Sequence, residues 1–329
     1  MSEWITPPPV YIPENLQNSI GGHTLITQAL IRRGITSPED ARAFMDPGEY
    51  SPSPADQLPG LTTAGARILQ AIQAQEQICV WGDFDVDGQT ATSLLVSTLR
   101  DLGANVHYYI PVRSKESHGV HLPRLQELID AGARVILTCD TGIAAIEAAN
   151  YAQTRGVDFL VTDHHELPAE LPPAFSITNP QMLPVNHPLR TLPGVGVAYK
   201  LAEYLFSSFG KAEKADELLD LAALGIVADV ALLHGDTRYL LQRGLAVLSQ
   251  PQREGLIALM DLAELNPVHI TEEHIGFMLA PRMNALGRLG DANSIVELLT
   301  TKDASQAKIM ALELEGLNAQ RQLLTNQVF

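Results

Sequence analysis

Five short apolar runs alternate with helical patterns through the middle of the chain. Each run is a few residues long and is bounded by polar, glycine or proline residues, which is typical of buried strands. The runs cover residues 78–81, 106–110, 135–137, 158–162 and 175–178. The segments between them carry apolar residues at helical spacing. This alternation predicts an α/β fold with a mostly parallel five-stranded sheet flanked by helices.

The first 60 residues predict a small helical extension that ends in a linker. Ser37 and Pro38 precede two acidic residues, an order that marks the start of a helix. Residues 46–60 are rich in proline and serine, so we expect them to form the linker.

The remaining chain divides into two predicted segments. Residues 61–235 form the α/β domain, and residues 236–329 form a helical region that ends in a long connecting helix. That helix begins near Thr301, and its apolar stripe consists of Ile309, Leu312, Leu317 and Leu324. A stripe of this kind is normally buried against a neighbouring element.

Composition fits a protein of a reducing cytoplasm. Of the 329 residues, 46% are apolar, enough to bury a sizeable core. Cys79 and Cys139 both fall in apolar runs, so we expect buried thiols and no disulfide. No signal peptide and no membrane-length apolar stretch is expected. The formal net charge of -16 argues against nucleic acid as a partner, unless bound cations reverse the local field.

A cluster of acids follows the first predicted strand. Asp83, Asp85 and Asp87 alternate within seven residues that begin and end with glycine. Clustered carboxylates repel one another without a cation, so this loop predicts metal binding rather than a solvated turn. A calcium-binding EF-hand loop is excluded, because Leu94 stands where that loop needs a glutamate and because a strand precedes it.

Asp140 follows the third predicted strand in the order Asp-Thr-Gly. Half of an aspartic protease site has the same letters, but those enzymes are all-β and this segment leads into a helix. Asp140 could instead cap that helix, a role that does not exclude metal ligation.

Asp163, His164 and His165 follow the fourth predicted strand. Imidazole together with carboxylate suits Mn²⁺, Zn²⁺ or Fe²⁺ better than Ca²⁺. Because parallel strands end at one edge of a sheet, three strand ends direct acids and imidazoles to one place. Such an arrangement is what a two-metal hydrolytic site requires.

The Gly194-Val195-Gly196 segment opens a further predicted helix. Its backbone N–H groups could bind a phosphate. The segment could equally be an ordinary helix start, and the sequence leaves both interpretations open.

In this order and on this strand pattern, these motifs resemble the DHH phosphoesterases. Residues 83–88, 139–142 and 163–165 match the first three family motifs, and residues 224–230 resemble the fourth. Residues 192–200 and 281–290 are similar to RecJ-type single-strand-specific DNA exonucleases in particular. The similarity extends from about residue 60 to the end.

The resemblance implies a 5′-to-3′ exonuclease of DNA repair and recombination that holds two divalent ions, Mn²⁺ or Mg²⁺. It implies single-stranded DNA and a single-strand-binding protein as partners. It implies no association with a membrane. The implied metal ligands are Asp85, Asp87, Asp140, Asp163, His164, His165 and Asp229, with Asp83 as a ligand or a neighbour of one. The implied phosphate contacts are Arg113, Arg282, Asn284 and Arg288. For Arg282 or Arg288 alone, a surface salt bridge is nearly as good an interpretation.

The chain departs from the family pattern in two places. Residues 116–120 read Glu-Ser-His-Gly-Val where RecJ proteins usually carry Glu-Gly-Tyr-Gly-Leu, so substrate handling near Arg113 is in doubt. We expect His118 to be a loop residue. We also expect the second DHH-associated domain of RecJ proteins to be absent. The alternatives are a phosphodiesterase or pyrophosphatase for small phosphoesters, and a non-catalytic DNA-binding scaffold of the Cdc45 type.

Asp163 carries one further expectation. Its replacement by alanine is expected to abolish turnover. The change should also relieve carboxylate repulsion, so that the metal-free protein is no less stable.

Overall fold

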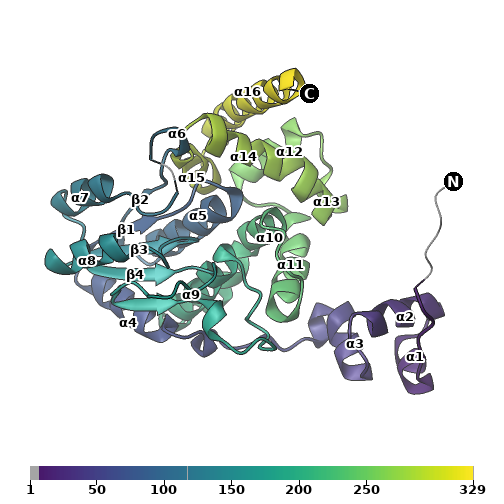
Figure 1. The fold of residues 1–329 in the computed structure, drawn as a ribbon. Coiled ribbons are helices and arrows are strands. Elements are labelled where there is room, and N and C mark those ends of the chain that lie inside the picture. Colours follow the sequence, from purple (N-terminus) through teal and green to yellow (C-terminus); the bar gives the residue numbers. More distant parts are fainter. Residues whose placement is uncertain (1–6, 117, 329) are drawn as a thin grey trace. The chain divides into compact units, whose positions relative to one another are not determined.

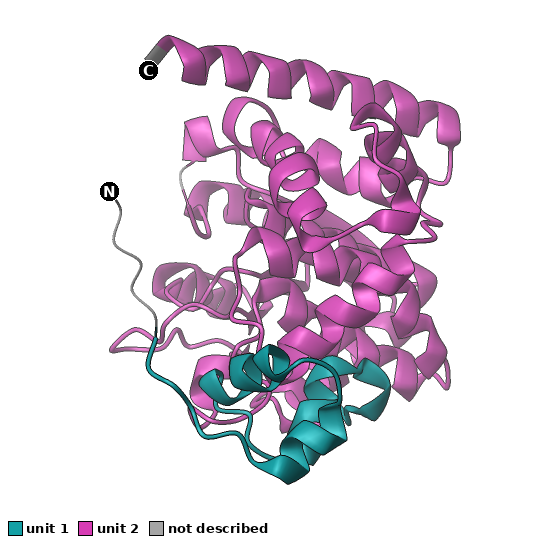
Figure 2. Cartoon of the chain, turned by 90° about the vertical axis from the view of Figure 1, so that its right-hand side faces the viewer, with its two compact units in different colours: residues 1–52 teal, residues 53–329 magenta. Residues whose placement is uncertain are grey.

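The computed structural model describes residues 7–116 and 118–328. Ser117 and Phe329, named in the sequence expectations, lie outside the described residues. The chain forms two compact units, residues 1–52 and residues 53–329 (Figure 1 and Figure 2). In the part of the chain that is described, no helix is long and apolar enough to cross a membrane.

The first unit is a three-helix extension, as the sequence predicts. Its helices are α1 (Glu14–Ile20), α2 (Thr24–Arg32) and α3 (Pro38–Met45). A small core of Leu16, Leu30 and Ala41 holds it together. The predicted helix start is confirmed, because the Asp40 N–H donates to the Ser37 hydroxyl at 3.0 Å.

The second unit is built on a five-stranded parallel sheet in the order β2-β1-β3-β4-β5. The predicted fold class is confirmed. The chain passes from β1 outward to β2 and then crosses to β3, so the strand order reverses between β1 and β3. At such a point the loops that leave the two strands diverge and open a crevice. The strands are β1 (Gln77–Trp81), β2 (Asn105–Tyr109), β3 (Val135–Cys139), β4 (Asp158–Thr162) and β5 (Ser176–Thr178).

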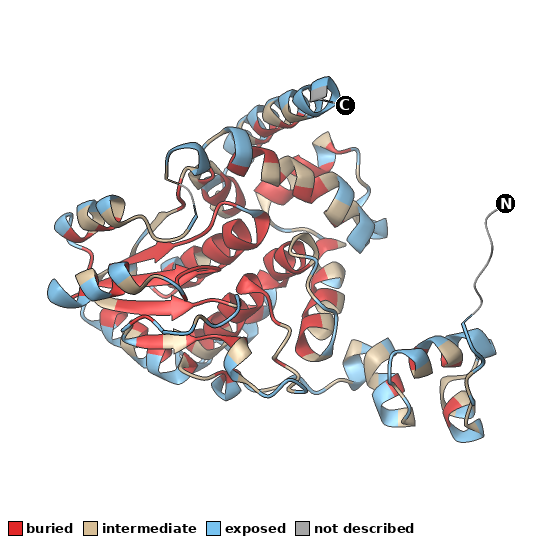
Figure 3. Ribbon diagram, viewed as in Figure 1, coloured by how far each residue is buried: buried red, intermediate tan, exposed pale blue. Residues whose placement is uncertain are grey.

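Strand residues alternate between two cores, as the two-residue period of a strand requires. Ile78 and Val80 face the larger core, while Cys79 and Trp81 face the smaller one. Both faces are covered, so the central strands are buried throughout (Figure 3). The larger core is covered by α4 (Leu61–Gln73), α5 (Val86–Asp101), α9 (Gly194–Ser208) and α10 (Leu219–Ala228); the smaller by α7 (Leu122–Asp130) and α8 (Ile146–Thr154).

The helices after α10 pack on the larger core, so no separate compact unit begins at residue 236. A π-helix at Ile275–Leu279 leads directly into α14. These helices are α11 (Gly235–Leu248), α12 (Glu254–Leu262), α13 (Glu272–His274), α14 (Ala280–Leu289), α15 (Asn293–Thr300) and α16 (Ala304–Val328).

The long last helix is present, but its predicted buried stripe is largely wrong. Ile309, Leu312 and Leu324 are exposed, and Leu317 packs partly buried against the larger core. The buried residues are Ala307, Ala311, Leu314 and Asn318. Small residues at helical spacing let α16 approach α12 and α14 closely, and this contact decides which face is buried.

The predicted linker is also only partly a linker. Ala55 and Leu58 are buried in the larger core, so the chain joins the second unit before residue 60. Ser53 begins that unit and is held by Asp236, which accepts from both its N–H and its hydroxyl.

A buried ion pair secures this start of the second unit. The Lys200 ammonium lies 3.2 Å from the Asp236 carboxylate and donates to the Ser53 carbonyl at 2.8 Å. Both charged side chains are almost fully buried.

We predict that Lys200→Met lowers the free energy of unfolding by about 3–5 kcal/mol, because it removes one partner of a buried ion pair. Urea denaturation measures the loss. The matched control is Lys214→Met, which breaks an exposed pair with Glu217 and should change stability little. Equal effects of the two substitutions would refute this account.

Candidate active site

The acidic loop leaves β1 at the reversal of strand order. Asp85 is the N-cap of α5, and its carboxylate accepts from the Gly88 N–H at 3.0 Å. Asp83 and Asp87 are buried beside it. The loop therefore presents three carboxylates at the carboxyl edge of the sheet, as the sequence predicts.

Asp87 is bound by the N-terminus of α9. Its two carboxylate oxygens accept from the Gly194 N–H at 2.6 Å and from the Val195 N–H at 2.8 Å. The positive end of the helix thus stabilises a buried carboxylate. These two N–H groups are not free for a phosphate, and the segment is more than an ordinary helix start.

Gly194 is required by close approach to the next acid. A Cβ atom at this position would lie 2.5 Å from the Cβ atom of Asp140. Only glycine lets α9 bring its N–H groups to Asp87 while Asp140 lies against the same turn.

Asp140 extends β3 in a left-handed backbone conformation with φ of 60°. Asp tolerates this conformation better than most residues. Its Oδ1 atom is buried and accepts no hydrogen bond, although His164 Nε2 lies 3.1 Å away. Asp140 does not cap the following helix, because α8 begins only at Ile146. A buried carboxylate oxygen without a donor is suited to a cation.

Asp163 is bound on both oxygens by the protein itself. Oδ1 accepts from the His164 and His165 N–H groups and lies 2.7 Å from His165 Nδ1. Oδ2 accepts from the Ile143 N–H at 2.9 Å. Asp163 therefore orients the histidine pair, as carboxylates behind metal-ligating histidines commonly do.

The pKa values divide the site into two kinds of groups. Burial first, and then the neighbouring carboxylates, raise the pKa of Asp87 and of Asp140 well above the ordinary value. Burial alone would raise the pKa of Asp163, but its bonds to His165 and to backbone N–H groups lower it. Asp163 is compensated by its donors and Asp140 is not, while the two N–H groups of α9 compensate Asp87 only in part.

The pKa values of the two histidines are shifted in opposite directions. The hydrogen bond that His165 donates to Asp163 raises the pKa of His165 to about 9. Burial and the neighbouring His165 lower the pKa of His164 to about 4. His164 is therefore neutral near pH 7, the form in which imidazole binds a metal.

Three groups of potential metal-ligating atoms converge here, each within 4.8 Å. The donor atoms across an octahedral Mg²⁺ ion are about 4.2 Å apart, so small movements would close each group around an ion. Among the described residues, Asp163 belongs to none of the three groups. They are Asp140, His164 and His165; Asp87, His164 and Asp229; and Asp83, Asp85 and Asp140.

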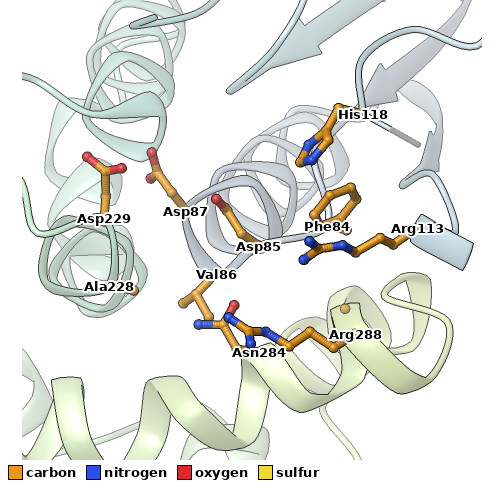
Figure 4. A pocket seen from close by; sticks show the side chains of 11 residues that line it. Phe84, Asp85, Val86, Asp87, Arg113, His118, Ala228, Asp229, Asn284 and Arg288 are labelled. Carbon is orange, nitrogen blue, oxygen red and sulfur yellow. The ribbon is translucent and has the colours of Figure 1, made fainter.

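A pocket of about 260 Å³ adjoins these carboxylates. Asp85, Asp87 and Asp229 line one part of it, and Arg113 and Arg288 extend toward it from the other (Figure 4). The latter side, which also includes Asn284 and His118, is called the cationic wall below. The cavity thus places positive groups opposite the acids.

Gly287 sets how closely α14 approaches the acidic loop. A Cβ atom there would lie 2.1 Å from the Phe84 carbonyl oxygen. Gln89 donates to the same carbonyl at 2.7 Å, and more weakly to the Met283 carbonyl at 3.4 Å. Backbone contact and a buried amide therefore fix the separation of helix and loop.

Arg282 is not brought to the pocket. Its guanidinium donates to Glu315 on α16 at 2.6 Å and to the Met278 carbonyl at 2.7 Å. The salt-bridge interpretation describes this residue, and the phosphate contact predicted for it has no support in the geometry. Arg113, Asn284 and Arg288 do line the pocket.

His118 lies in a loop, as expected, and its side chain also lines the pocket, whereas Phe84 was missed. His118 Nδ1 lies 3.9 Å from Asp83, and its ring lies 4.5 Å from the Phe84 ring. Arg113 is placed over the same phenyl ring. The only sequence signal for Phe84 was an aromatic residue between two acids of the loop.

The comparisons with known proteins agree with this geometry. The family model "DHH family, N-terminal domain" matches residues 77–226. A crystal structure of exonuclease RecJ bound to manganese superimposes with a TM-score of 0.77 at 36% identity, covering 82% of this chain and 68% of that one. The chain belongs to the DHH family, in the group of the RecJ exonucleases.

Two further relatives show how far the similarity extends. RecJ of Thermus thermophilus in complex with Mn²⁺ superimposes with a TM-score of 0.85 at 32% identity, covering 98% of this chain and 46% of that one. The single-stranded-DNA-specific exonuclease RecJ of Bacillus subtilis is 40% identical over 92% of this chain and 38% of its own length. The chain therefore spans less than half of each of these relatives.

We predict opposite effects of two substitutions on the metal-free protein. Asp140→Asn should raise the melting temperature near neutral pH, because it removes an uncompensated buried charge and asparagine tolerates positive φ. Asp163→Asn should lower it, because it loses a carboxylate that protein donors stabilise. Thermal unfolding in chelator measures both, with exposed Asp130→Asn as the neutral control. A shift of the same sign for both would contradict the division of roles.

We also predict that the metal-free protein loses stability as pH rises. Burial, and the charge of Asp85, raise the pKa of Asp83 and of Asp229 from 3.8 to about 6. The folded state therefore binds more protons than the unfolded state between about pH 4 and pH 6, and stability falls across that range. The raised pKa of His165 adds stability that is lost between about pH 6.5 and pH 9. Melting temperatures against pH should be flatter for Asp229→Asn, and an unchanged slope would count against this interpretation.

Proposed function

We propose that this chain hydrolyses phosphodiester bonds in single-stranded DNA as a metal-dependent exonuclease of the RecJ type, with 5′-to-3′ polarity and a role in DNA repair and recombination. One observation carries the proposal: buried carboxylate oxygens without donors lie beside a wall of arginine and asparagine side chains. The first feature suits cations, and the second suits phosphate. Its named relatives are single-stranded-DNA-specific exonucleases.

The residues that would hold two divalent ions are Asp83, Asp85, Asp87, Asp140, His164, His165 and Asp229. Oxygen donors with one or two imidazoles suit Mn²⁺ or Mg²⁺. Bound there, the ions supply activation of water and neutralise charge on the phosphate oxygens. The unpaired Oδ1 atoms of Asp83 and Asp140 support this fit.

The chain's own residues prepare the chemistry before substrate binds. Asp163 fixes the ring of His165 through Nδ1, which leaves Nε2 for a ligand. His164 stays neutral because burial lowers its pKa. The N-terminus of α9 positions Asp87 by two hydrogen bonds.

The cationic wall would hold the phosphate beside the carboxylates that would bind the ions. Arg113 and Arg288 would donate charge-assisted hydrogen bonds to phosphate oxygens, and Asn284 would add a neutral donor. His118 is largely exposed beside Phe84, so its ring offers a face on which an unpaired base can stack. Stacking of this kind favours a single strand over a duplex.

The cationic wall also bears on how a protein of negative net charge would bind DNA. A protein with a formal charge of -16 does not attract DNA over long distances. Binding would therefore depend on the local cations of the wall and on bound metal. The proposal places the reaction in the cytoplasm, with a single-strand-binding protein as a further partner.

We predict that hydrolysis requires a divalent ion. With Mn²⁺, the chain should release mononucleotides from a 5′-labelled single strand early in the reaction, and excess chelator should abolish this because the ligand carboxylates then lack their cation. Duplex DNA, a cyclic dinucleotide and pyrophosphate are the comparison substrates. Faster turnover of the small phosphoesters would overturn the DNA assignment. Undiminished hydrolysis in chelator would overturn the two-metal mechanism.

A further inference from the structure

The edge strand of the sheet ends close to the pocket. Among the described strands β2 pairs only with β1, and the Gly82 N–H donates to the Tyr109 carbonyl as the last bond between them. The next residue, Ile110, is fully buried, and its backbone groups point away from β1 by the alternation of a strand. A buried peptide group at a sheet edge needs a partner from elsewhere.

Asn293 supplies that partner with its side-chain amide. Its Oδ1 accepts from the Ile110 N–H at 2.8 Å, and its Nδ2 donates to the Ile110 carbonyl at 2.8 Å. Asp291 orients the amide, because its Oδ1 accepts from Nδ2 at 2.6 Å and from the Asn293 N–H at 2.9 Å. The amide thus replaces the missing neighbouring strand at one peptide group.

This contact joins the two segments that carry Arg113 and Arg288. Arg113 follows Ile110 by three residues on the four-residue helix α6 (Arg113–Glu116). Arg288 lies at the end of α14, just before the turn that leads to Asn293 at the start of α15. Two segments far apart in the sequence are therefore joined, and α6 also lies against α14.

A helix as short as α6 does not hold its own position. Besides Asn293, its anchor is Glu116, whose carboxylate accepts from the Val112 N–H at 2.9 Å and from the Tyr109 hydroxyl. Glu116 ties the helix to its own strand. Asn293 connects the end of β2 to the start of α15.

We propose that Asn293 is a positioning residue for substrate binding: it fixes Arg113 relative to Arg288, and so sets the affinity for single-stranded DNA without touching it. The inference rests on the proposed function. Asn293 is not among the described residues that line the pocket beside the acids; it lines a second pocket, together with Asp291, Lys115 and Arg124. We expect its effect on substrate to pass through the arginines.

The test is steady-state kinetics of Asn293→Leu on a single-stranded oligonucleotide with Mn²⁺. We expect KM to rise roughly tenfold, the loss of about one charge-assisted contact, while kcat changes by less than about threefold. The Mn²⁺ concentration for half-maximal activity should not change. Combined with Arg113→Ala, the two effects should be less than multiplicative, because both act on one contact.

The matched control is Tyr108→Phe. It removes a 3.3 Å hydrogen bond from the Tyr108 hydroxyl to Glu297, which also joins β2 to α15 but does not involve Ile110. Its KM should stay close to that of the unmodified chain. If Asn293→Leu raises KM no more than this control, the inference is wrong.

Two further outcomes separate the inference from the proposed function. If Arg113→Ala and Arg288→Ala both leave KM unchanged, the cationic wall does not bind substrate and the proposed function loses its support. If they raise KM and Asn293→Leu does not, only the inference fails. Asn293→Asp, which keeps the acceptor for the Ile110 N–H, serves if the leucine variant does not fold; unfolding of both, with Tyr108→Phe folded, would make Asn293 a determinant of the fold and overturn the proposal.

Discussion

The site depends on the free energy of keeping several carboxylates together in a buried place. Each of them is desolvated, and each raises the pKa of its neighbours. The fold meets this cost unevenly. The α9 N-terminus compensates Asp87, and a set of N–H donors compensates Asp163, whereas Asp140 and Asp83 keep unpaired oxygens. The unpaired carboxylate oxygens of Asp83 and Asp140 give the site its affinity for cations.

Much of this arrangement could be predicted from the sequence. The alternation of short apolar runs with helical patterns predicts the five strands and their parallel direction. The residues that follow parallel strands all lie at the carboxyl edge of the sheet, so the convergence of acids there is also predicted. The role of Asp163 did not follow. The same letters describe a ligand and a residue that orients ligands, and only the positions of the Ile143 and His165 donors distinguish the two. The expectation that its removal would relieve repulsion is contradicted by its lowered pKa.

Other errors have a common physical origin. Arg282 and the apolar stripe of α16 were both assigned from local sequence, but each is decided by a partner distant in the chain. Arg282 forms an ion pair with Glu315, and α16 buries Ala307 and Ala311 where it packs on α12 and α14. Single-sequence patterns specify which residues can be buried or charged. They do not specify which surface each one will meet.

The contact between Gly287 and the Phe84 carbonyl has a consequence for how such a chain can change over time. Two main-chain segments in direct contact act as a rigid spacer, since neither can be compressed and neither depends on a side chain for its dimensions. Substitutions at the rim of the cavity therefore leave its width unchanged. Under the proposed function, residues such as His118 could vary and change the preferred substrate, while the cavity keeps its size.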